Sequence, residues 1–181
     1  LVQTQRFELA KPLLFKATQI NPNYAVAHNN LGTALKELGE LQRAINCYKE
    51  AVQISPNYAD AHNNLGTLYQ ELGKYMEAFF SYQKSILIDP NHMKAIKNVS
   101  ILSKRTRLTN VNATNTDSLK KLFLFLFRRN DIYHQDIFFN AKSVLLSSDN
   151  YNELRETTNS DSLLLKNKII KNMLKEELLL L

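Results

Sequence analysis

Apolar residues recur at helical spacing along the first half of the chain. Between residues 25 and 58 they fall on one face of a helix, in two successive runs. The first run ends at Gly39, and the second begins at Leu41 and ends before Pro56. Glycine permits the left-handed turn that closes a helix, and proline cannot extend one. The pattern therefore predicts two helices joined by a tight turn, and it returns between residues 59 and 92.

This hydrophobic pattern has a period of 34 residues. Pro22, Pro56 and Pro90 are spaced by that distance, and 16 of 34 positions are identical between residues 25–58 and 59–92. Both segments begin with Ala-x-Ala-His-Asn-Asn-Leu-Gly-Thr. A fixed period of this length is typical of solenoids built from stacked helical hairpins. The chain is therefore predicted to be all-α, with a superhelical solenoid in this half.

The repeat resembles the tetratricopeptide repeat (TPR), and its signature residues occur in order. Those residues are Leu31, Gly32, Leu35, Ala44, Tyr48, Ala51 and Pro56, then Leu65, Gly66, Tyr69, Ala78, Tyr82 and Pro90. His28 and His62 stand where the family often has Trp, and Ser85 where it has Ala. The resemblance implies a TPR solenoid over residues 1–108, in which partial repeats 1–24 and 93–108 flank full repeats 25–58 and 59–92.

Small residues within each repeat suggest a close approach of its two helices. They are Gly32 with Ala44 in the first full repeat, and Gly66 with Ala78 in the second. A larger side chain at these positions would overpack the contact. We therefore expect these small residues to leave room for the two helices of each repeat to approach closely.

Pro12 interrupts the first helix that the pattern predicts. Either that helix begins near Lys11, which places Pro12 in its first turn, or the helix is kinked there. We expect the later start.

Position six of the repeat holds asparagine three times, at Asn30, Asn64 and Asn98. The first helix of each TPR lines the concave wall, so these amides would form a row along it. An amide offers a donor and an acceptor, which suit the backbone of an extended peptide whatever its side chains. The row resembles the asparagine ladder in the TPR region of O-linked N-acetylglucosamine transferases, and many bacterial TPR arrays. The alternative is a common repeat sequence whose amides are hydrated or bonded across repeats.

The resemblance implies a groove that binds a protein or peptide partner. Its shape would come from the neighbours of the ladder, Asn29, Asn63, Thr33, Thr67, Lys36 and Gln70. No reaction is expected in this chain. The alternative is that the repeats recruit substrate for a larger bacterial methyltransferase, sulfotransferase or glycosyltransferase whose catalytic domain is absent from this sequence. Weak self-association through apolar faces, including Leu178–Leu181, is a third alternative.

The composition changes after Leu108. Residues 109–117 are rich in Asn and Thr and predict a linker. A buried helix is expected from Ser118 to Arg129, because the run Leu122–Phe127 is apolar all round. Further helices are expected at Tyr133–Leu146, Tyr151–Thr157 and Asn167–Leu181. Residues 118–181 would then cap the repeats or connect them to another domain.

Charge and hydropathy narrow the classes of partner. The net charge of +6 lies in residues 93–181, since residues 1–92 carry eight basic and eight acidic side chains. The basic residues are mostly dispersed, so no nucleic acid is expected. No apolar run approaches the ~20 residues that span a bilayer, so no membrane partner is expected. The chain has no secretory signal, so a cytoplasmic location is expected. It also lacks an initiator Met, so we expect it to be a piece of a longer protein.

The sequence offers little to catalysis or metal binding. Cys47 is the single cysteine and is expected to pack as a small apolar residue, and no cofactor is expected. His28 and His62 are interpreted as packing residues, because they occupy equivalent repeat positions. His134, near Asp131 and Asp136, is a weak metal candidate. Finally, His92 is expected to be exposed, and Asp60 and Glu71 to be solvated charges.

Overall fold

The computed structural model describes residues 2–106, 113–127, 140–141 and 144. Contacts between Cα atoms divide the chain into two units, Leu1–Val99 and Ser100–Leu181. All regular secondary structure in the described residues is helical. The prediction of an all-α solenoid is confirmed by these helices and by their arrangement.

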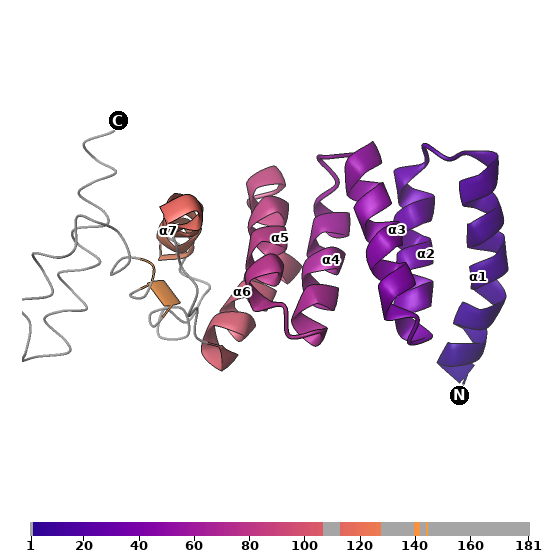
Figure 1. Ribbon diagram of the computed structural model, residues 1–181, viewed down its shortest axis with the longest axis horizontal. Coiled ribbons are helices and arrows are strands. Elements are labelled where there is room, and N and C mark those ends of the chain that lie inside the picture. Colours follow the sequence, from indigo (N-terminus) through magenta and orange to yellow (C-terminus); the bar gives the residue numbers. More distant parts are fainter. Residues whose placement is uncertain (1, 107–112, 128–139, 142–143, 145–181) are drawn as a thin grey trace, which may run out of the picture. The chain divides into compact units, whose positions relative to one another are not determined.

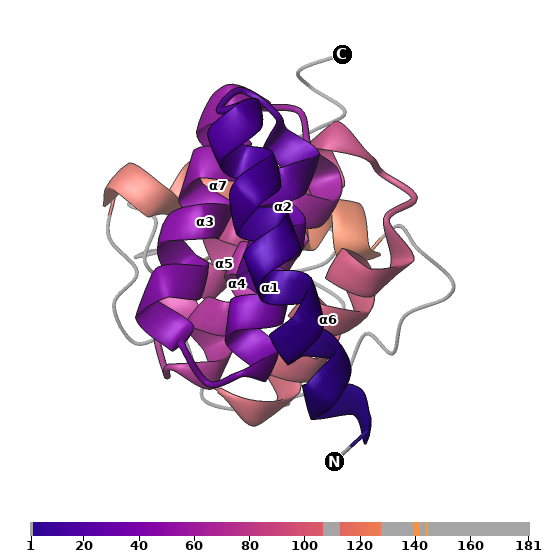
Figure 2. The ribbon, with the colours of Figure 1, turned by 90° about the vertical axis from the view of Figure 1, so that its right-hand side faces the viewer.

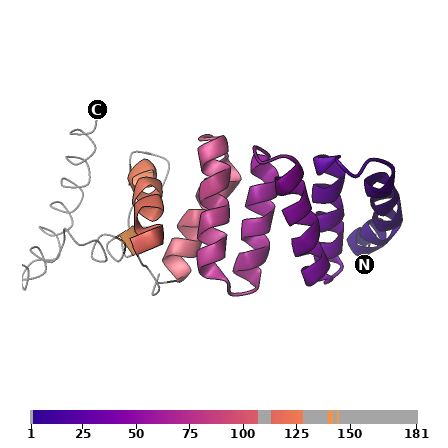
Figure 3. The ribbon, with the colours of Figure 1, turned by 45° about the horizontal axis from the view of Figure 1, so that its top comes forward.

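The repeat half is a row of helices that follow one another in chain order. Successive helices run in opposite directions and lie side by side (Figure 1, Figure 3). Viewed along the row, α2 and α3 lie on either side of α1 (Figure 2). The helices are α1 (Val2–Ile20), α2 (Ala25–Glu37), α3 (Leu41–Ile54), α4 (Ala59–Glu71), α5 (Tyr75–Ile88) and α6 (Met93–Arg105). Helices α2 and α3 pack as one hairpin, and α4 and α5 as the next.

The turn inside each hairpin is closed by the backbone alone. Gly39 and Gly73 have φ angles of +79° and +73°, as the sequence predicted for residues that end a helix. Past Gly39, the amide of Glu40 donates to the carbonyl of Leu35 at 2.9 Å, and Gly39 itself donates to Lys36 at 2.9 Å. This pair of bonds is a Schellman motif, which satisfies carbonyls that the helix end would otherwise leave unpaired. The same pair closes α4, so the two hairpins turn alike.

The close approach of the two helices in a hairpin is made by glycine against tyrosine. A Cβ atom added at Gly32 would lie 2.8 Å from the Tyr48 ring, and one at Gly66 would lie 2.7 Å from the Tyr82 ring. Both rings are almost completely buried. The predicted close approach of the two helices is therefore present, and at Gly32 the nearest side chain is that of Tyr48. At Gly66 the carbonyl oxygen of Ala78 also lies near, at 3.2 Å.

One apolar cluster joins the first hairpin to α4. Its buried members are Leu31, Leu35, Ala44, Ile45, Tyr48, Leu65 and Leu68. Leu14 of α1 and Cys47 of α3 pack against this cluster, as expected of Cys47. Burial raises the pKa of the Cys47 thiol. Because the cluster draws on consecutive hairpins, each hairpin completes the core of its neighbour.

Helix α1 continues through Pro12, so the expected start near Lys11 is wrong. A proline inside a helix removes the bond to the carbonyl four residues earlier, here that of Glu8. Glu8 and Pro12 are both exposed, so water can solvate that carbonyl. The interruption therefore costs less than it would on a buried face.

The second unit contains α7 (Ala113–Phe127), which begins at Ala113 rather than at the expected Ser118. Leu119, Leu122, Phe123 and Leu126 are buried, which agrees with the helix predicted from this apolar run. In the same unit the buried amide of Asn140 donates to the carbonyls of Ser103 at 3.1 Å and Thr106 at 2.9 Å. The helices predicted at Tyr151–Thr157 and Asn167–Leu181, and the run Leu178–Leu181, lie outside the described residues.

Candidate functional site

The first helices of the repeats bring the predicted asparagines onto one face. Asn30 of α2 is exposed, and Asn64 of α4 and Asn98 of α6 are half-buried. Their sequence neighbours Asn29 and Asn63 are buried, with 5% and 4% of their surface exposed. The five residues, Asn29, Asn30, Asn63, Asn64 and Asn98, are called the amide face below.

Two short hydrogen bonds cross from one repeat to the next on the amide face. The Nδ2 atom of Asn64 donates to Oδ1 of Asn29 at 3.0 Å. One repeat further, Nδ2 of Asn98 donates to Oδ1 of Asn63 at 3.0 Å and to the hydroxyl of Thr67 at 3.4 Å. The inter-repeat bonding that the sequence left open as an alternative is therefore present. Because an amide has two N–H groups and an oxygen with two lone pairs, Asn98 directs both N–H groups to the preceding repeat and can meet a ligand with its oxygen, whereas Nδ2 of Asn64 has one acceptor on this face.

Weaker bonds complete the amide face within each repeat. Nδ2 of Asn29 lies 3.4 Å from Oδ1 of Asn30 and 3.4 Å from the hydroxyl of Tyr58, and Nδ2 of Asn63 lies 3.5 Å from Oδ1 of Asn64. Sequence reasoning missed Tyr58, which lies just before α4. Burial raises the pKa of its hydroxyl, so Tyr58 is neutral at pH 7.

Thr33, Thr67 and Gln70 are engaged inside their own hairpins. Thr33 and Thr67 each donate to the carbonyl four residues earlier, at 3.1 Å in both repeats. The hydroxyl of buried Tyr82 donates to Oε1 of Gln70 at 2.9 Å. Burial raises the pKa of Tyr82 to about 12. These three predicted groove residues therefore hold the hairpin together, whatever else they contact.

Lys36 forms an ionic link between repeats at the end of the same face. Its ammonium lies 3.1 Å from Glu37 of its own helix and 3.2 Å from Glu71 of α4. Glu71 was expected to be a solvated charge and is instead an exposed partner of this ion pair. Partial burial acts to lower the pKa of Lys36, but the hydrogen bonds to Glu37 and Glu71 outweigh it and raise the pKa. The pair neutralises much of the charge that Lys36 would bring to a ligand.

The histidines of the full repeats close the turns between repeats. Nε2 of His28 donates to the carbonyl of Pro22 at 2.9 Å, and Nε2 of His62 donates to Pro56 at 2.9 Å. Burial lowers the pKa of His62, because it disfavours the charged ring. These contacts support the interpretation of both histidines as packing residues.

His92 differs from the prediction of an exposed side chain. Its side chain is 10% exposed, and its Nε2 atom lies 3.1 Å from Oδ1 of Asp60. The amide of Ala95 donates to its Nδ1 atom at 3.2 Å, which caps the start of α6. Asp60, expected to be a solvated charge, is therefore a hydrogen-bond partner from the preceding repeat.

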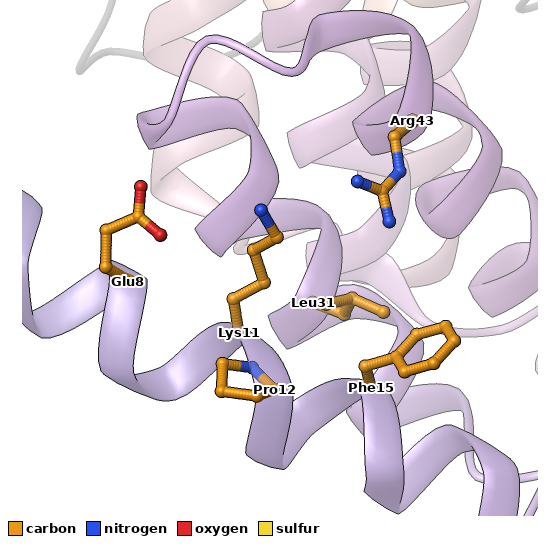
Figure 4. A pocket seen from close by; sticks show the side chains of 6 residues that line it. All are labelled: Glu8, Lys11, Pro12, Phe15, Leu31 and Arg43. Atoms are coloured by element: carbon orange, nitrogen blue, oxygen red, sulfur yellow. The ribbon is translucent and has the colours of Figure 1, made fainter.

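A pocket of about 200 Å³ lies where α1 meets the first hairpin (Figure 4). Its walls come from three helices, α1, α2 and α3. The lining residues are Glu8, Lys11, Pro12, Phe15, Leu31 and Arg43. Lys11 Nζ lies 2.5 Å from Oε1 of Glu40, and Arg43 also pairs with Glu40. The hydrogen bond from Lys11, with that from Arg43, lowers the pKa of the Glu40 carboxyl.

Neither a metal cluster nor a membrane span emerges from the described part of the chain. No three His, Cys, Asp or Glu side chains among the described residues lie close enough to hold a metal ion. None of the described helices has the length and hydropathy to cross a bilayer. His134, Asp131 and Asp136 lie outside the described residues.

Family models match the part of the chain that holds these hairpins. One model, described as a TPR repeat, matches residues 32–73. Two more, each described as the tetratricopeptide repeat, match residues 59–92 and 13–46. Residues 13–92 of the chain are matched by models of the tetratricopeptide repeat. A comparison with curated protein sequences found no match.

Two solved structures resemble the chain. The crystal structure of YrrB, described as "a TPR protein with an unusual peptide-binding site", is 31% identical, with a TM-score of 0.50. That match covers 54% of this chain and spans 50% of the YrrB chain. The crystal structure of MamA has a TM-score of 0.53 at 22% identity, and covers 80% of this chain and 70% of its own. The likeness to MamA concerns the fold alone.

Proposed function

We propose that these TPR repeats bind an extended protein or peptide segment along the amide face. In this proposal Asn30, Asn64 and Asn98 contact the backbone of the ligand. The observation that carries the proposal is the recurrence of these amides on successive repeats, where Asn64 and Asn98 each donate at 3.0 Å to an asparagine of the preceding repeat. Because an amide can donate and accept at once, such a row matches a peptide backbone independently of its side chains.

The comparison with YrrB supports the class of ligand. YrrB is described as having a peptide-binding site, and it shares 31% identity with this chain over the matched repeats. The described residues form two full repeats with parts of two more, so we expect weak binding of an isolated peptide. The resemblance to the asparagine ladder of O-linked N-acetylglucosamine transferases stays a prediction.

A peptide array tests the proposal. Random peptides of about 12 residues, long enough to span the three repeats when extended, would be immobilised and probed with the wild-type protein. The variant Asn30→Ala/Asn64→Ala/Asn98→Ala should lose binding to the captured peptides while its circular dichroism stays helical. Asn46→Ala/Asn57→Ala, which changes exposed asparagines elsewhere, is the matched control and should bind like wild type. Equal binding by the triple variant would refute the proposal.

Other expectations about function stay predictions. They include the absence of a reaction in this chain, the alternative of substrate recruitment for a transferase, weak self-association, the cytoplasmic location and the absence of a nucleic-acid partner.

A further inference from the structure

The five side chains of the amide face form a continuous series of hydrogen bonds. Asn98 donates to Asn63, and Asn64 donates to Asn29, both at 3.0 Å. Asn63 in turn donates to Asn64 at 3.5 Å, and Asn29 donates to Asn30 at 3.4 Å. In every link an Nδ2 atom donates to an Oδ1 atom, and the series runs in one direction, from Asn98 through Asn63, Asn64 and Asn29 to Asn30. The two short links join repeats, and the two long ones lie within a repeat.

We infer that Asn29 and Asn63 are positioning residues for the ligand-binding amides of Asn64 and Asn98. This inference rests on the proposed function. Asn29 and Asn63 are only 5% and 4% exposed, so they offer almost no surface to a ligand. Their Oδ1 atoms instead accept the bond that orients the amide of the next repeat.

The physical reason lies in the two-fold ambiguity of an amide side chain. Rotation by about 180° exchanges its donor and acceptor, and water favours neither orientation strongly. A buried acceptor at 3.0 Å selects the orientation in which Nδ2 faces the preceding repeat. Consecutive bonds in one direction also polarise one another. A peptide then meets amides that are already oriented, so less freedom is lost on binding.

The arrangement repeats, which makes an accidental contact a poor explanation. The acceptor is the residue at repeat position five, and the donor is position six of the next repeat, in both cases. The two bonds are therefore related by the 34-residue period of the chain. Asn30 ends the series, since its Oδ1 atom accepts from Asn29 of its own repeat.

The first measurement needs no ligand. In the ¹⁵N-labelled full chain, the side-chain amide protons of Asn64 and Asn98 should exchange slowly with water. Asn29→Leu removes the acceptor for Asn64 and should speed exchange at Asn64 while leaving Asn98 unchanged. Asn63→Leu should do the reverse. Asn29→Asp keeps an acceptor oxygen and should preserve slow exchange at Asn64.

The second measurement uses a peptide captured by the wild-type protein on the random array. Asn29→Leu should weaken its binding about fivefold, the effect of one lost hydrogen bond. Asn29→Asp should bind within about twofold of wild type, and so should the control Asn46→Leu on the exposed side of α3. All variants should keep the circular dichroism of the parent.

The outcomes separate the inference from the proposed function. Unchanged exchange at Asn64 in Asn29→Leu would overturn the inference even if peptides bind through the ladder. Faster exchange with unchanged peptide affinity would also overturn it, because the bond would then serve only the fold. If Asn30→Ala/Asn64→Ala/Asn98→Ala binds the peptide normally, the proposed function fails, and the positioning role fails with it while the exchange pattern persists.

Discussion

Helix α1 packs against the first hairpin, and α3 packs against the second. These two contacts have different side chains at positions that lie one 34-residue period apart. Ile45 is buried in the apolar cluster beside Leu65. One period earlier the same position holds Lys11, which lines a pocket of about 200 Å³ beside Leu31. Phe79, one period later, is again fully buried. The same repeat position is therefore apolar and buried in α3 and α5, and is a lysine that lines a pocket in α1.

The difference extends to the charges around each contact. Glu40 pairs with Lys11 and Arg43 at the first contact. At the second contact the position of Glu40 is taken by Lys74, one period later. The polar contact is therefore a matched set, since the lysine at the core position is accompanied by its counter-charge. The repeat fold therefore accommodates an apolar residue at this position, or a lysine that has a glutamate as its partner.

The largest effect should come from placing the lysine alone in the apolar contact. Ile45→Lys would put an ammonium at a site that is 3% exposed, and the position that Glu40 takes beside Lys11 is there held by Lys74. We expect a loss of about 3–5 kcal/mol in the free energy of unfolding, because a buried charge without a partner is costly. Urea denaturation of Ile45→Lys and of the mild control Ile45→Val measures it. A loss below about 1 kcal/mol would mean that the ammonium reaches water.

The reverse substitution should have a smaller effect of opposite sign. Lys11→Ile would place an apolar side chain against Phe15 and Leu31 in the pocket. We expect it to raise the free energy of unfolding by about 1 kcal/mol, since a half-buried ion pair that water still reaches contributes little and buried methylene groups contribute more. Urea denaturation measures the change, with Lys16→Ile on the exposed surface of α1 as control. A decrease in stability would show that the pair with Glu40 outweighs apolar burial.

The smallest effect should be a difference in acid sensitivity. The pKa of Glu40 lies below 4.5 because Lys11 and Arg43 hydrogen bond to its carboxylate. Its stabilisation is therefore present above pH 4.5 and is lost as the pH falls through the lowered folded-state pKa. Thermal unfolding from pH 7 to pH 3 should show a slightly steeper fall in Tm for wild type than for Glu40→Gln. Parallel curves would mean that water screens the pair completely.

Features decided by local backbone chemistry could be predicted from the sequence. The positive φ angles of Gly39 and Gly73 follow from the end of an apolar run at a glycine. The ends of α3 and α5 follow from Pro56 and Pro90. The packing role of His28 follows from His62, which holds the equivalent position in the next repeat. The hydrogen bond of His28 to the carbonyl of Pro22 is also local, since the two residues lie six apart.

Features decided by how helices rotate against one another could not be predicted. The contact of Gly32 with the Tyr48 ring depends on the orientation of α3 against α2. The bond between Asn64 and Asn29 joins residues 35 apart and depends on the stacking of the hairpins. Lys11 is a different case, since a lysine aligned with Ile45 and Phe79 is visible in the sequence. This lysine departs from the apolar pattern at its repeat position, and it is one of the residues that line the pocket.

The hydrogen bond by which His62 closes the turn between repeats bears on how a repeat protein can become longer by duplication. The ring and the carbonyl of Pro56 lie six residues apart, and the glycine turn lies inside the same hairpin. A duplicated segment of 34 residues would therefore carry its own glycine turn and its own histidine and proline, and it would add a further Asn-Asn pair. Unequal recombination within a gene can lengthen this architecture one unit at a time without redesigning a junction. The ligand surface would grow in the same steps as the protein.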